Sequence, residues 1–209
     1  MNGVLRSIYY FNSEGRHNLP KTVELVVDRA KELGIGNIIV FTSNGEGAFL
    51  VKENLGDDIP IKVHAATFPY KQVFFGKDAE GNIIENIPDT SLPEVREKLT
   101  SMGINLVQGV MPLQDIILPG AKDIKTQTIH YTLTLISAGL RLCVQAILMA
   151  VDGGHIESGE TVIAMSADTA IVARSSLSTW LFHPNHGLEI NEIICKPNRC
   201  TITHSTLTE

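Results

Sequence analysis

Residues 37–48 have the sequence NIIVFTSNGEGA. The first five, Asn37 to Phe41, form a short apolar run of the length typical of a strand buried on both faces of a parallel sheet. The next six, Thr42 to Gly47, are polar and include two glycines, and a helix is expected from Ala48 to Asn54. A strand, a polar loop and a helix in this order are the building unit of an α/β fold.

The alternation of helix and strand continues on both sides of this stretch. Asn18 as a cap and Pro20 in the first turn predict the start of a helix that Gly34 closes. Further strands are expected at 61–67, 104–109, 161–166 and 170–174, and further helices at 91–102, with Ser91 as its cap, and at 126–151. This pattern predicts one domain over residues 1–209 with a mainly parallel sheet covered on both faces.

Two connections depart from the parallel pattern. The link from Ser166 to Ala170 is too short for a parallel crossover, so the strand after it is expected to run antiparallel. Residues 70–90 are rich in glycine, proline and polar residues and predict an excursion from the sheet, a hairpin with its tip at 78–82.

Composition limits the class of protein. The chain has 209 residues, 44% hydrophobic and 19% charged, which is enough apolar material for a sizeable core. The formal net charge of −6 argues against nucleic acid as a partner. An odd count of three cysteines and an N-terminus without signal-peptide features predict a reduced, cytoplasmic protein. The apolar stretch 129–151 contains Arg141 and Gln145, so a buried helix is expected there and no membrane span.

The polar loop is the strongest candidate for a binding site. It would present backbone N–H groups at a helix N-terminus, where the helix dipole favours an anion. Ligands of open α/β sheets also bind at the carboxyl ends of strands, where this loop lies. The candidate residues combine hydroxyl and amide donors with glycines that let the backbone approach a phosphate: Thr42, Ser43, Asn44, Gly45, Glu46, Gly47 and Ala48.

Two considerations weigh against that interpretation. Glu46 is an anion in the same loop, so it must point away from a bound phosphate or be paired. A capped helix start with turn glycines would have the same sequence without any ligand.

Several stretches along the chain together resemble a known family. They are Tyr10-Phe11, Asn18, 30–35, 42–48, Ala138-Gly139, Val144, Met149-Ala150, Asp152, 162–164, 167–170 and 192–197. They are similar to stand-alone proteins that have the fold of the C-terminal α/β domain of pyruvate kinase. The resemblance implies a three-layer α/β/α sandwich, a mixed sheet whose last strand is antiparallel, and residues 42–48 as a phosphate loop.

The resemblance also bears on ligands and assembly. It implies flavin mononucleotide (FMN), or another phosphorylated small molecule, as the ligand, and a homo-oligomer, which we expect to be a dimer. The catalytic barrel of pyruvate kinase is absent, so that activity is not implied. Two positions depart from the family pattern: Met165-Ser166 run directly into Ala167-Asp168 where glycines are expected, and Gln145 replaces an acid.

Weaker candidates lie elsewhere in the chain. Asp168, with Thr169 beside it, follows a strand and is a candidate to bind a ligand hydroxyl or ring N–H, although Asp-Thr is also ordinary turn chemistry. His64 is interpreted as a satisfied histidine, since no base-orienting partner is near it in the sequence. Arg141 must reach solvent, a partner or the ligand crevice, and solvent is expected because its helix carries no acid three or four residues away.

The chain also contains possible metal ligands and an aromatic cluster. Cys195 and Cys200 with His204, or His183 with His186, do not have the spacing of a zinc knuckle, so no metal is expected. The aromatic residues Phe68, Tyr70, Phe74 and Phe75 would stack on a flat ring or pack against a neighbouring subunit.

The functional hypotheses fall into three classes. The first is a binding module that holds a phosphorylated small molecule, with FMN as the candidate, at Thr42 to Ala48. The second is an enzyme that uses such a ligand as cofactor or substrate. The third is a regulatory or interaction subunit whose loop is only structural.

Overall fold

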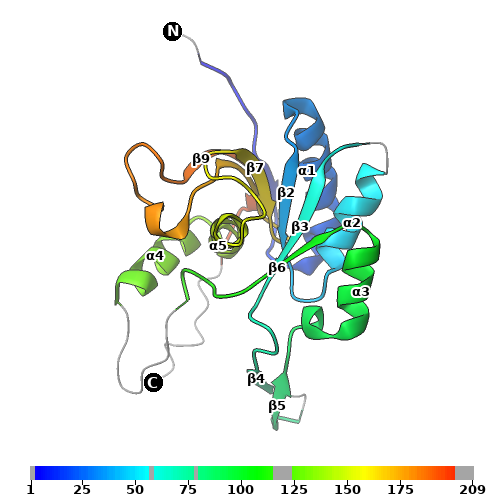
Figure 1. Ribbon diagram of the computed structural model, residues 1–209. Coiled ribbons are helices and arrows are strands. Elements are labelled where there is room, and N and C mark those ends of the chain that lie inside the picture. Colours follow the sequence, from blue (N-terminus) through cyan, green and yellow to red (C-terminus); the bar gives the residue numbers. More distant parts are fainter. Residues whose placement is uncertain (1–2, 57–58, 78–79, 115–123, 201–209) are drawn as a thin grey trace.

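The computed structural model describes residues 3–56, 59–77, 80–114 and 124–200 (Figure 1). Its centre is a seven-stranded sheet with the strand order β1-β9-β8-β7-β2-β3-β6. The strands are β1 Tyr9–Phe11, β2 Asn37–Phe41, β3 Lys62–Thr67, β6 Asn105–Gln108, β7 Thr161–Met165, β8 Ala170–Arg174 and β9 Glu189–Pro197. β2 pairs in parallel with both β3 and β7, β3 with β6, and β1 with β9.

The predicted direction changes are confirmed. β8 runs antiparallel to β7, as the short connection requires, and the last strand, β9, pairs antiparallel with β8. The sheet is therefore mixed and mostly parallel, with antiparallel pairing confined to its last strands.

Helices cover both faces of the sheet, which confirms the three-layer sandwich (Figure 1). One face carries α1 Leu19–Leu33, α2 Glu46–Leu55 and α3 Pro93–Ser101; the other carries α5 Ala138–Asp152, against which α4 Ile124–Thr134 packs. Three short 3₁₀ helices complete the elements: η1 Arg16–Asn18, η2 Asp89–Ser91 and η3 Ser178–Trp180.

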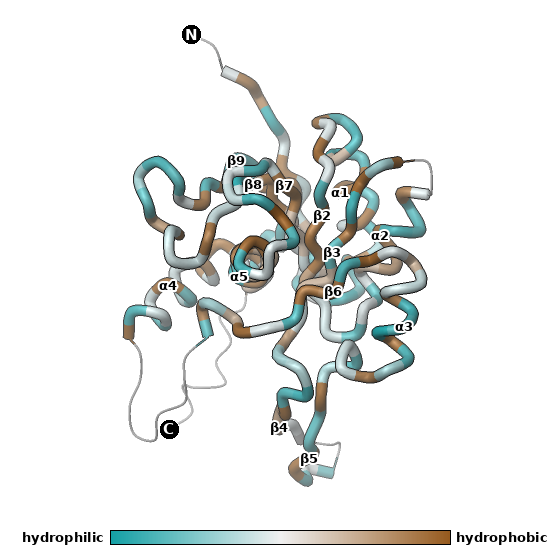
Figure 2. Tube along the Cα trace, viewed as in Figure 1, coloured by the Kyte–Doolittle hydropathy of each residue, from teal (hydrophilic) through white to brown (hydrophobic). Residues whose placement is uncertain are grey.

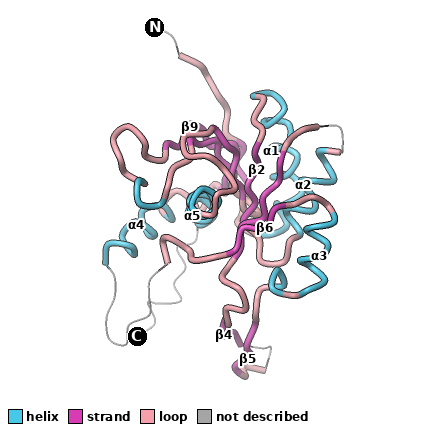
Figure 3. The backbone as a smooth tube through the Cα atoms, in the orientation of Figure 1, coloured by secondary structure: helices cyan, strands magenta, loops and turns pink. Residues whose placement is uncertain are grey.

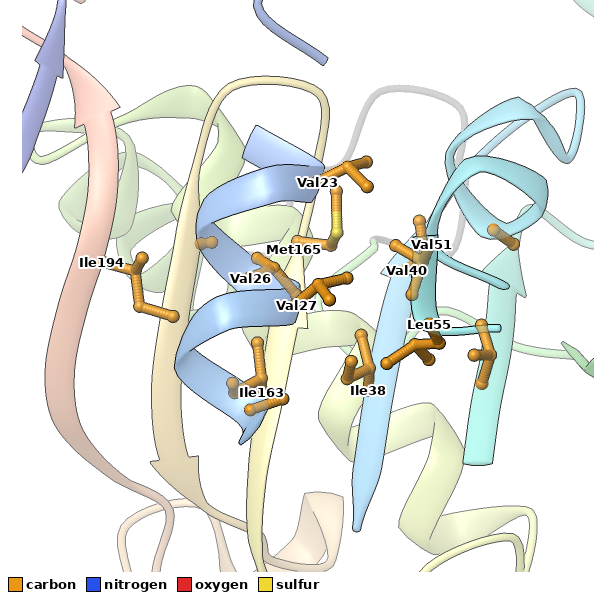
Figure 4. Close-up of a cluster of buried hydrophobic side chains, with 14 of the residues drawn as sticks. Val23, Val26, Val27, Ile38, Val40, Val51, Leu55, Ile163, Met165 and Ile194 are labelled. Carbon is orange, nitrogen blue, oxygen red and sulfur yellow. The ribbon is translucent and has the colours of Figure 1, made fainter. Parts of the chain in front are cut away.

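The alternation of side chains along β2 builds two cores. Ile38 and Val40 belong to the cluster beneath α1 and α2 (Figure 4). Ile39 and Phe41 belong to the cluster beneath α5. Both faces of the strand are buried, which is why its sequence is a continuous apolar run. In Figure 2, brown tube along the central strands and α5 marks their hydrophobic residues.

Helix α1 begins and ends as the sequence predicts. Pro20 lies in its first turn, where a missing N–H costs no helical bond, and Gly34 ends it in the left-handed conformation at φ 64°. Asn18 precedes the helix but makes no side-chain capping bond; its Nδ2 donates instead to the Ser13 carbonyl at 2.8 Å.

The prediction of one long helix over 126–151 is wrong, because the chain turns between α4 and α5. Ser137 is the N-cap of α5, and its Oγ accepts a hydrogen bond from Leu140 N at 3.0 Å. The first turn of α5 lies so close to the β7–β8 turn that a Cβ at Gly139 would be 2.4 Å from Ser166 Oγ and from Thr169 Oγ1. The break therefore lets α5 start where only glycine fits.

Other differences are smaller. Ser91 lies in η2 and does not cap α3, which begins at Pro93; the Ser91 Oγ accepts from Lys71 N at 2.9 Å. The strands β1, at one edge of the sheet, and β9, which lies between β1 and β8, were not predicted. The expected hairpin is present as β4 Phe74–Lys77 and β5 Ile83–Asn86, which project away from the sheet (Figure 3). Within the described residues, no helix has the length and apolar character to cross a membrane.

Candidate phosphate-binding cavity

A cavity of about 270 Å³ opens at the carboxyl ends of β2 and β7. Its walls include Thr42, Ser43 and Asn44 from the loop after β2, Ser166 and Ala167 from the turn after β7, and Arg16 from η1. We call it the loop cavity. It lies at the edge of an open α/β sheet where such folds bind ligands, as predicted.

The side chains of the loop cap helix α2. Thr42 Oγ1 accepts from Gly45 N at 3.0 Å, and Asn44 Oδ1 accepts from Glu46 N at 3.1 Å. Two of the N–H groups expected to meet an anion therefore already have partners within the loop. The Ser43 hydroxyl makes no hydrogen bond to a described residue and lies in the cavity wall.

The glycines of the loop are required by packing. Gly45 has φ 84°, and a Cβ there would lie 2.9 Å from the Phe49 ring. A Cβ at Gly47 would lie 3.0 Å from Val40 Cγ1. Close packing against α2 and β2 accounts for both glycines without a ligand.

An ion pair stands at the mouth of the cavity. Arg16 Nε donates to Glu46 Oε2 at 2.6 Å, and a second guanidinium nitrogen contacts the same carboxylate. The side chains are 67% and 41% exposed. Of the two alternatives for Glu46, pointing away from a bound phosphate or being paired, the structure shows the pairing. Sequence reasoning missed Arg16, because the two residues are 30 positions apart and no local pattern links them.

The remaining predicted site residues lie close by but face elsewhere. Ala48 is fully buried in the core beneath α2. Asp168 Oδ2 accepts from Gly15 N at 2.9 Å, and buried Thr169 Oγ1 lies 2.6 Å from Ser137 Oγ. These bonds join the turn after β7 to the segment before η1 and to α5. Their role as ligand residues stays a prediction.

A second, larger cavity of about 440 Å³ lies between α4, α5 and residues 111–114. We call it the α4–α5 cavity. It shares Phe68 and Leu142 with the loop cavity, so the two are adjacent. Gln145, the residue that replaces an expected acid, lines it, and its Oε1 accepts from Leu113 N at 3.2 Å.

Arg141 lines the α4–α5 cavity and contacts a partner group there, so it does not simply extend into solvent as expected. Its side chain is half-buried and contacts the imidazole of His130, with Nη1 at 3.3 Å from Nδ1. Burial lowers the pKa of the Arg141 guanidinium, and the nearby Tyr131 opposes that shift. The change of chain direction between α4 and α5 brings His130 on α4 next to Arg141 on α5.

His64 lies at the opposite end of the sheet and is satisfied, as interpreted. Its Nε2 is 3.0 Å from Asn37 Oδ1 and its Nδ1 is 3.4 Å from Asn105 Nδ2. Burial, with a smaller contribution from charge repulsion by His155 and Lys62, lowers the pKa of His64 to about 4. A neutral buried imidazole is the result.

No group of three or more metal-ligating side chains occurs among the residues that the structure describes. His183 Nδ1 accepts from Asn185 N and His186 N, each at 3.2 Å, so that nitrogen is occupied within its own loop. Cys195 is fully buried, and burial raises the pKa of its thiol to about 12. His204 lies outside the described residues.

The four aromatic residues near the excursion separate into two groups. Phe68 packs edge-on against Phe41 and Phe74, at centroid distances of 5.1 and 4.8 Å. Tyr70 and Phe75 are 57% and 73% exposed, and Arg96 lies over the Tyr70 ring. Only Phe68 borders the cavities described above.

Comparison with known proteins identifies the family. The family described as "Pyruvate kinase, alpha/beta domain" matches residues 21–176, about three-quarters of the chain. The chain belongs to the pyruvate kinase α/β domain family.

The solved structures that the chain matches include two of pyruvate kinase. A Cryptosporidium parvum pyruvate kinase crystal structure is 16% identical, with a TM-score of 0.35, and the match covers 70% of this chain and 20% of that one. The enzyme from the same organism in complex with ADP is 16% identical, with a TM-score of 0.38, over 85% of this chain and 23% of that one. The chain thus spans about a fifth of the pyruvate kinases it matches.

The match to the pyruvate kinase α/β domain includes the loop Thr42 to Ala48 and the turn after β7, both of which border the loop cavity. Arg16 lies outside the matched residues. The cation at the mouth of the cavity is thus supplied by the segment that precedes the family match.

Proposed function

We propose that the loop cavity binds the phosphate group of a small molecule. The observation that carries the proposal is the meeting of Arg16, the Ser43 hydroxyl and the N-terminus of α2 around one cavity at the carboxyl ends of the strands. A cation, a hydroxyl donor and a helix N-terminus are the groups that phosphate sites combine.

Binding requires Arg16 to change partner. An exposed ion pair such as Arg16–Glu46 contributes about 0–1 kcal/mol, and a charge-assisted hydrogen bond to phosphate contributes about 1.5–3 kcal/mol. Replacing Glu46 by phosphate as the partner of Arg16 is therefore favourable once the Glu46 side chain has moved away. Because Thr42 and Asn44 already cap two N–H groups, Arg16 and Ser43 make the main contacts.

We propose FMN as the first ligand to test. Its phosphate would occupy the loop cavity, and its flat ring needs an adjacent apolar surface. Phe68 and Leu142 provide such a surface, since they separate the loop cavity from the α4–α5 cavity. Aromatic side chains stack on flat rings at little conformational cost.

A specific observation favours one alternative, a loop that is only structural. The Thr42 and Asn44 caps and the packing of Gly45 and Gly47 explain the loop sequence without a ligand. The test must therefore detect binding itself and not stability of the loop.

The test is a calorimetric titration of the purified protein with inorganic phosphate and, separately, with FMN. Wild-type protein is expected to bind both, FMN more tightly, and Arg16→Gln is expected to weaken phosphate binding by about tenfold. Lys31→Gln is a matched control, since this exposed residue also carries one positive charge but lies about 18 Å along α1 from Leu19. Absence of phosphate binding by wild-type protein would establish the structural alternative; binding of phosphate without FMN would exclude FMN alone.

We also propose that the protein is a cytoplasmic homodimer. Two of its free cysteines, Cys143 and Cys195, are buried thiols, as in proteins of reducing compartments. The projecting hairpin exposes Phe75 and Ile83, each 73% exposed, and such apolar side chains mark contact surfaces. Light scattering is expected to give twice 22.8 kDa; a 22.8 kDa particle would contradict the dimer.

A further inference from the structure

The α4–α5 cavity contains a cation without an acidic partner. Among the described residues, no carboxylate pairs with Arg141, and its Nε is buried without a hydrogen-bond partner. Within the described part of the chain, its guanidinium contacts the ring of His130 and lies near Tyr131. An arginine cannot shed its proton to escape burial, so its charge persists inside the cavity.

The polar groups around Arg141 are neutral. Gln114, Gln127 and Gln145 line the same cavity, and none of the described lining residues is an acid. A half-buried charge surrounded by neutral amides is under-compensated, because burial weakens its hydration and no described group of opposite sign replaces it. An anion bound in the cavity would supply the compensation.

The size, charge and lining of the cavity indicate the class of anion. One fixed cation balances one negative charge, whereas a phosphate monoester would bring close to two and leave one uncompensated. A planar carboxylate also matches the fork of a guanidinium. The remaining walls are apolar, with Phe68, Met111, Leu113 and Leu142, and about 440 Å³ accommodates a small organic molecule.

We propose that the α4–α5 cavity binds a carboxylate-bearing small molecule with an apolar or aromatic body, with the carboxylate paired to Arg141. The glutamine side chains would donate to the carboxylate oxygens, and Phe68 and Leu142 would contact the body of the molecule. This proposal does not depend on phosphate binding at the loop cavity. The two cavities share a wall, so one molecule with both groups would also fit the pair.

The probe is benzoate, with benzamide as its uncharged counterpart. Ligand-observed NMR on the full chain, at millimolar probe, is expected to show benzoate binding at least tenfold tighter than benzamide. This comparison uses wild-type protein alone, so it does not depend on whether a variant folds. Arg141→Met is expected to remove the preference for benzoate, and Arg141→Lys to retain part of it.

Lys31→Gln is the matched control for loss of a surface charge and is expected to leave benzoate affinity unchanged. Equal affinity for benzoate and benzamide would overturn the proposal, because the cavity would then not recognise charge. Unchanged benzoate binding in folded Arg141→Met would overturn it as well. Displacement of benzoate by equimolar inorganic phosphate would contradict the assignment to a monoanion.

Discussion

The two cavities border each other, but their arginines differ in burial and in pairing. In the loop cavity, Arg16 is 67% exposed and pairs with Glu46, which is also exposed. In the α4–α5 cavity, Arg141 is half-buried and has no acidic partner among the described residues. Exposed ion pairs form and break at little free-energy cost, but a buried cation without an anion is costly to keep.

This difference separates two kinds of ligand site. At the loop cavity an incoming anion must compete with the Glu46 carboxylate for Arg16. The affinity for the anion therefore depends on the free energy lost when the Arg16–Glu46 ion pair breaks. At the α4–α5 cavity no acid from the described chain competes, so affinity depends on how well the ligand compensates Arg141.

The largest expected effect concerns His64, a buried group that, unlike Arg141, can lose its proton. Its pKa is about 4 in the folded protein and about 6.5 when unfolded. Above pH 6.5 both states are neutral and the folded state keeps its full stability. As the pH falls from about 6.5 to about 4, the unfolded state binds the proton first, so the free energy of unfolding falls by about 3 kcal/mol.

Denaturant unfolding between pH 7 and pH 4 measures this effect. His64→Asn removes the titrating group, so the difference between the wild-type and variant pH slopes isolates its contribution. Parallel slopes for the two proteins would show that His64 is not held neutral by burial.

The next-largest effect concerns the contact between the first turn of α5 and the turn after β7, which positions residues of both cavities. Gly139→Ala places a Cβ within 2.4 Å of the Ser166 and Thr169 hydroxyl oxygens, so the start of α5 must move. Overpacking of this kind costs about 2 kcal/mol of unfolding free energy. Gly36→Ala is the control, since its Cβ would meet nothing within 4 Å.

Chemical denaturation measures both glycine variants. Equal stability of Gly139→Ala and Gly36→Ala would mean that α5 has room to shift, and that the position of Arg141 and Leu142 on it is not fixed by this contact.

A smaller effect is expected when Arg141 itself is removed. Arg141→Met, measured without ligand, is expected to leave the free energy of unfolding unchanged or to raise it by about 1 kcal/mol, because a half-buried charge is removed, no described partner is left unpaired and the methionine packs in its place. A loss of about 3–5 kcal/mol would reveal a buried partner and contradict the comparison between the cavities.

The sequence predicts much of the fold because the deciding signals are local. The run 37–41, the turn at Gly34 and the polar stretch 42–47 each specify their own backbone conformation. The break between α4 and α5 is harder to recognise. Ser137 has the chemistry of a cap, but apolar residues continue across it, and the reason for the break is a close approach to the turn at 166–169.

The site was only partly predictable for the same reason. The loop Thr42 to Asn44 was found from its composition, and the charge of Glu46 indicated that it must be paired or point away from a phosphate. Arg16 and Arg141 were missed as cavity residues because their placement depends on contacts between distant segments. Glycine is needed at position 45 because a Cβ there would meet the Phe49 ring, and the sequence does not reveal that close approach.

The most direct test of the central claim is the phosphate affinity of Glu46→Gln, measured by calorimetry beside wild-type protein. If phosphate binds at the loop cavity by taking Arg16 from Glu46, removing the competing charge should tighten phosphate binding several-fold, on the order of 1 kcal/mol. Arg16→Gln should shift affinity in the opposite direction. Phosphate affinity that is unchanged or weaker in Glu46→Gln would contradict the account.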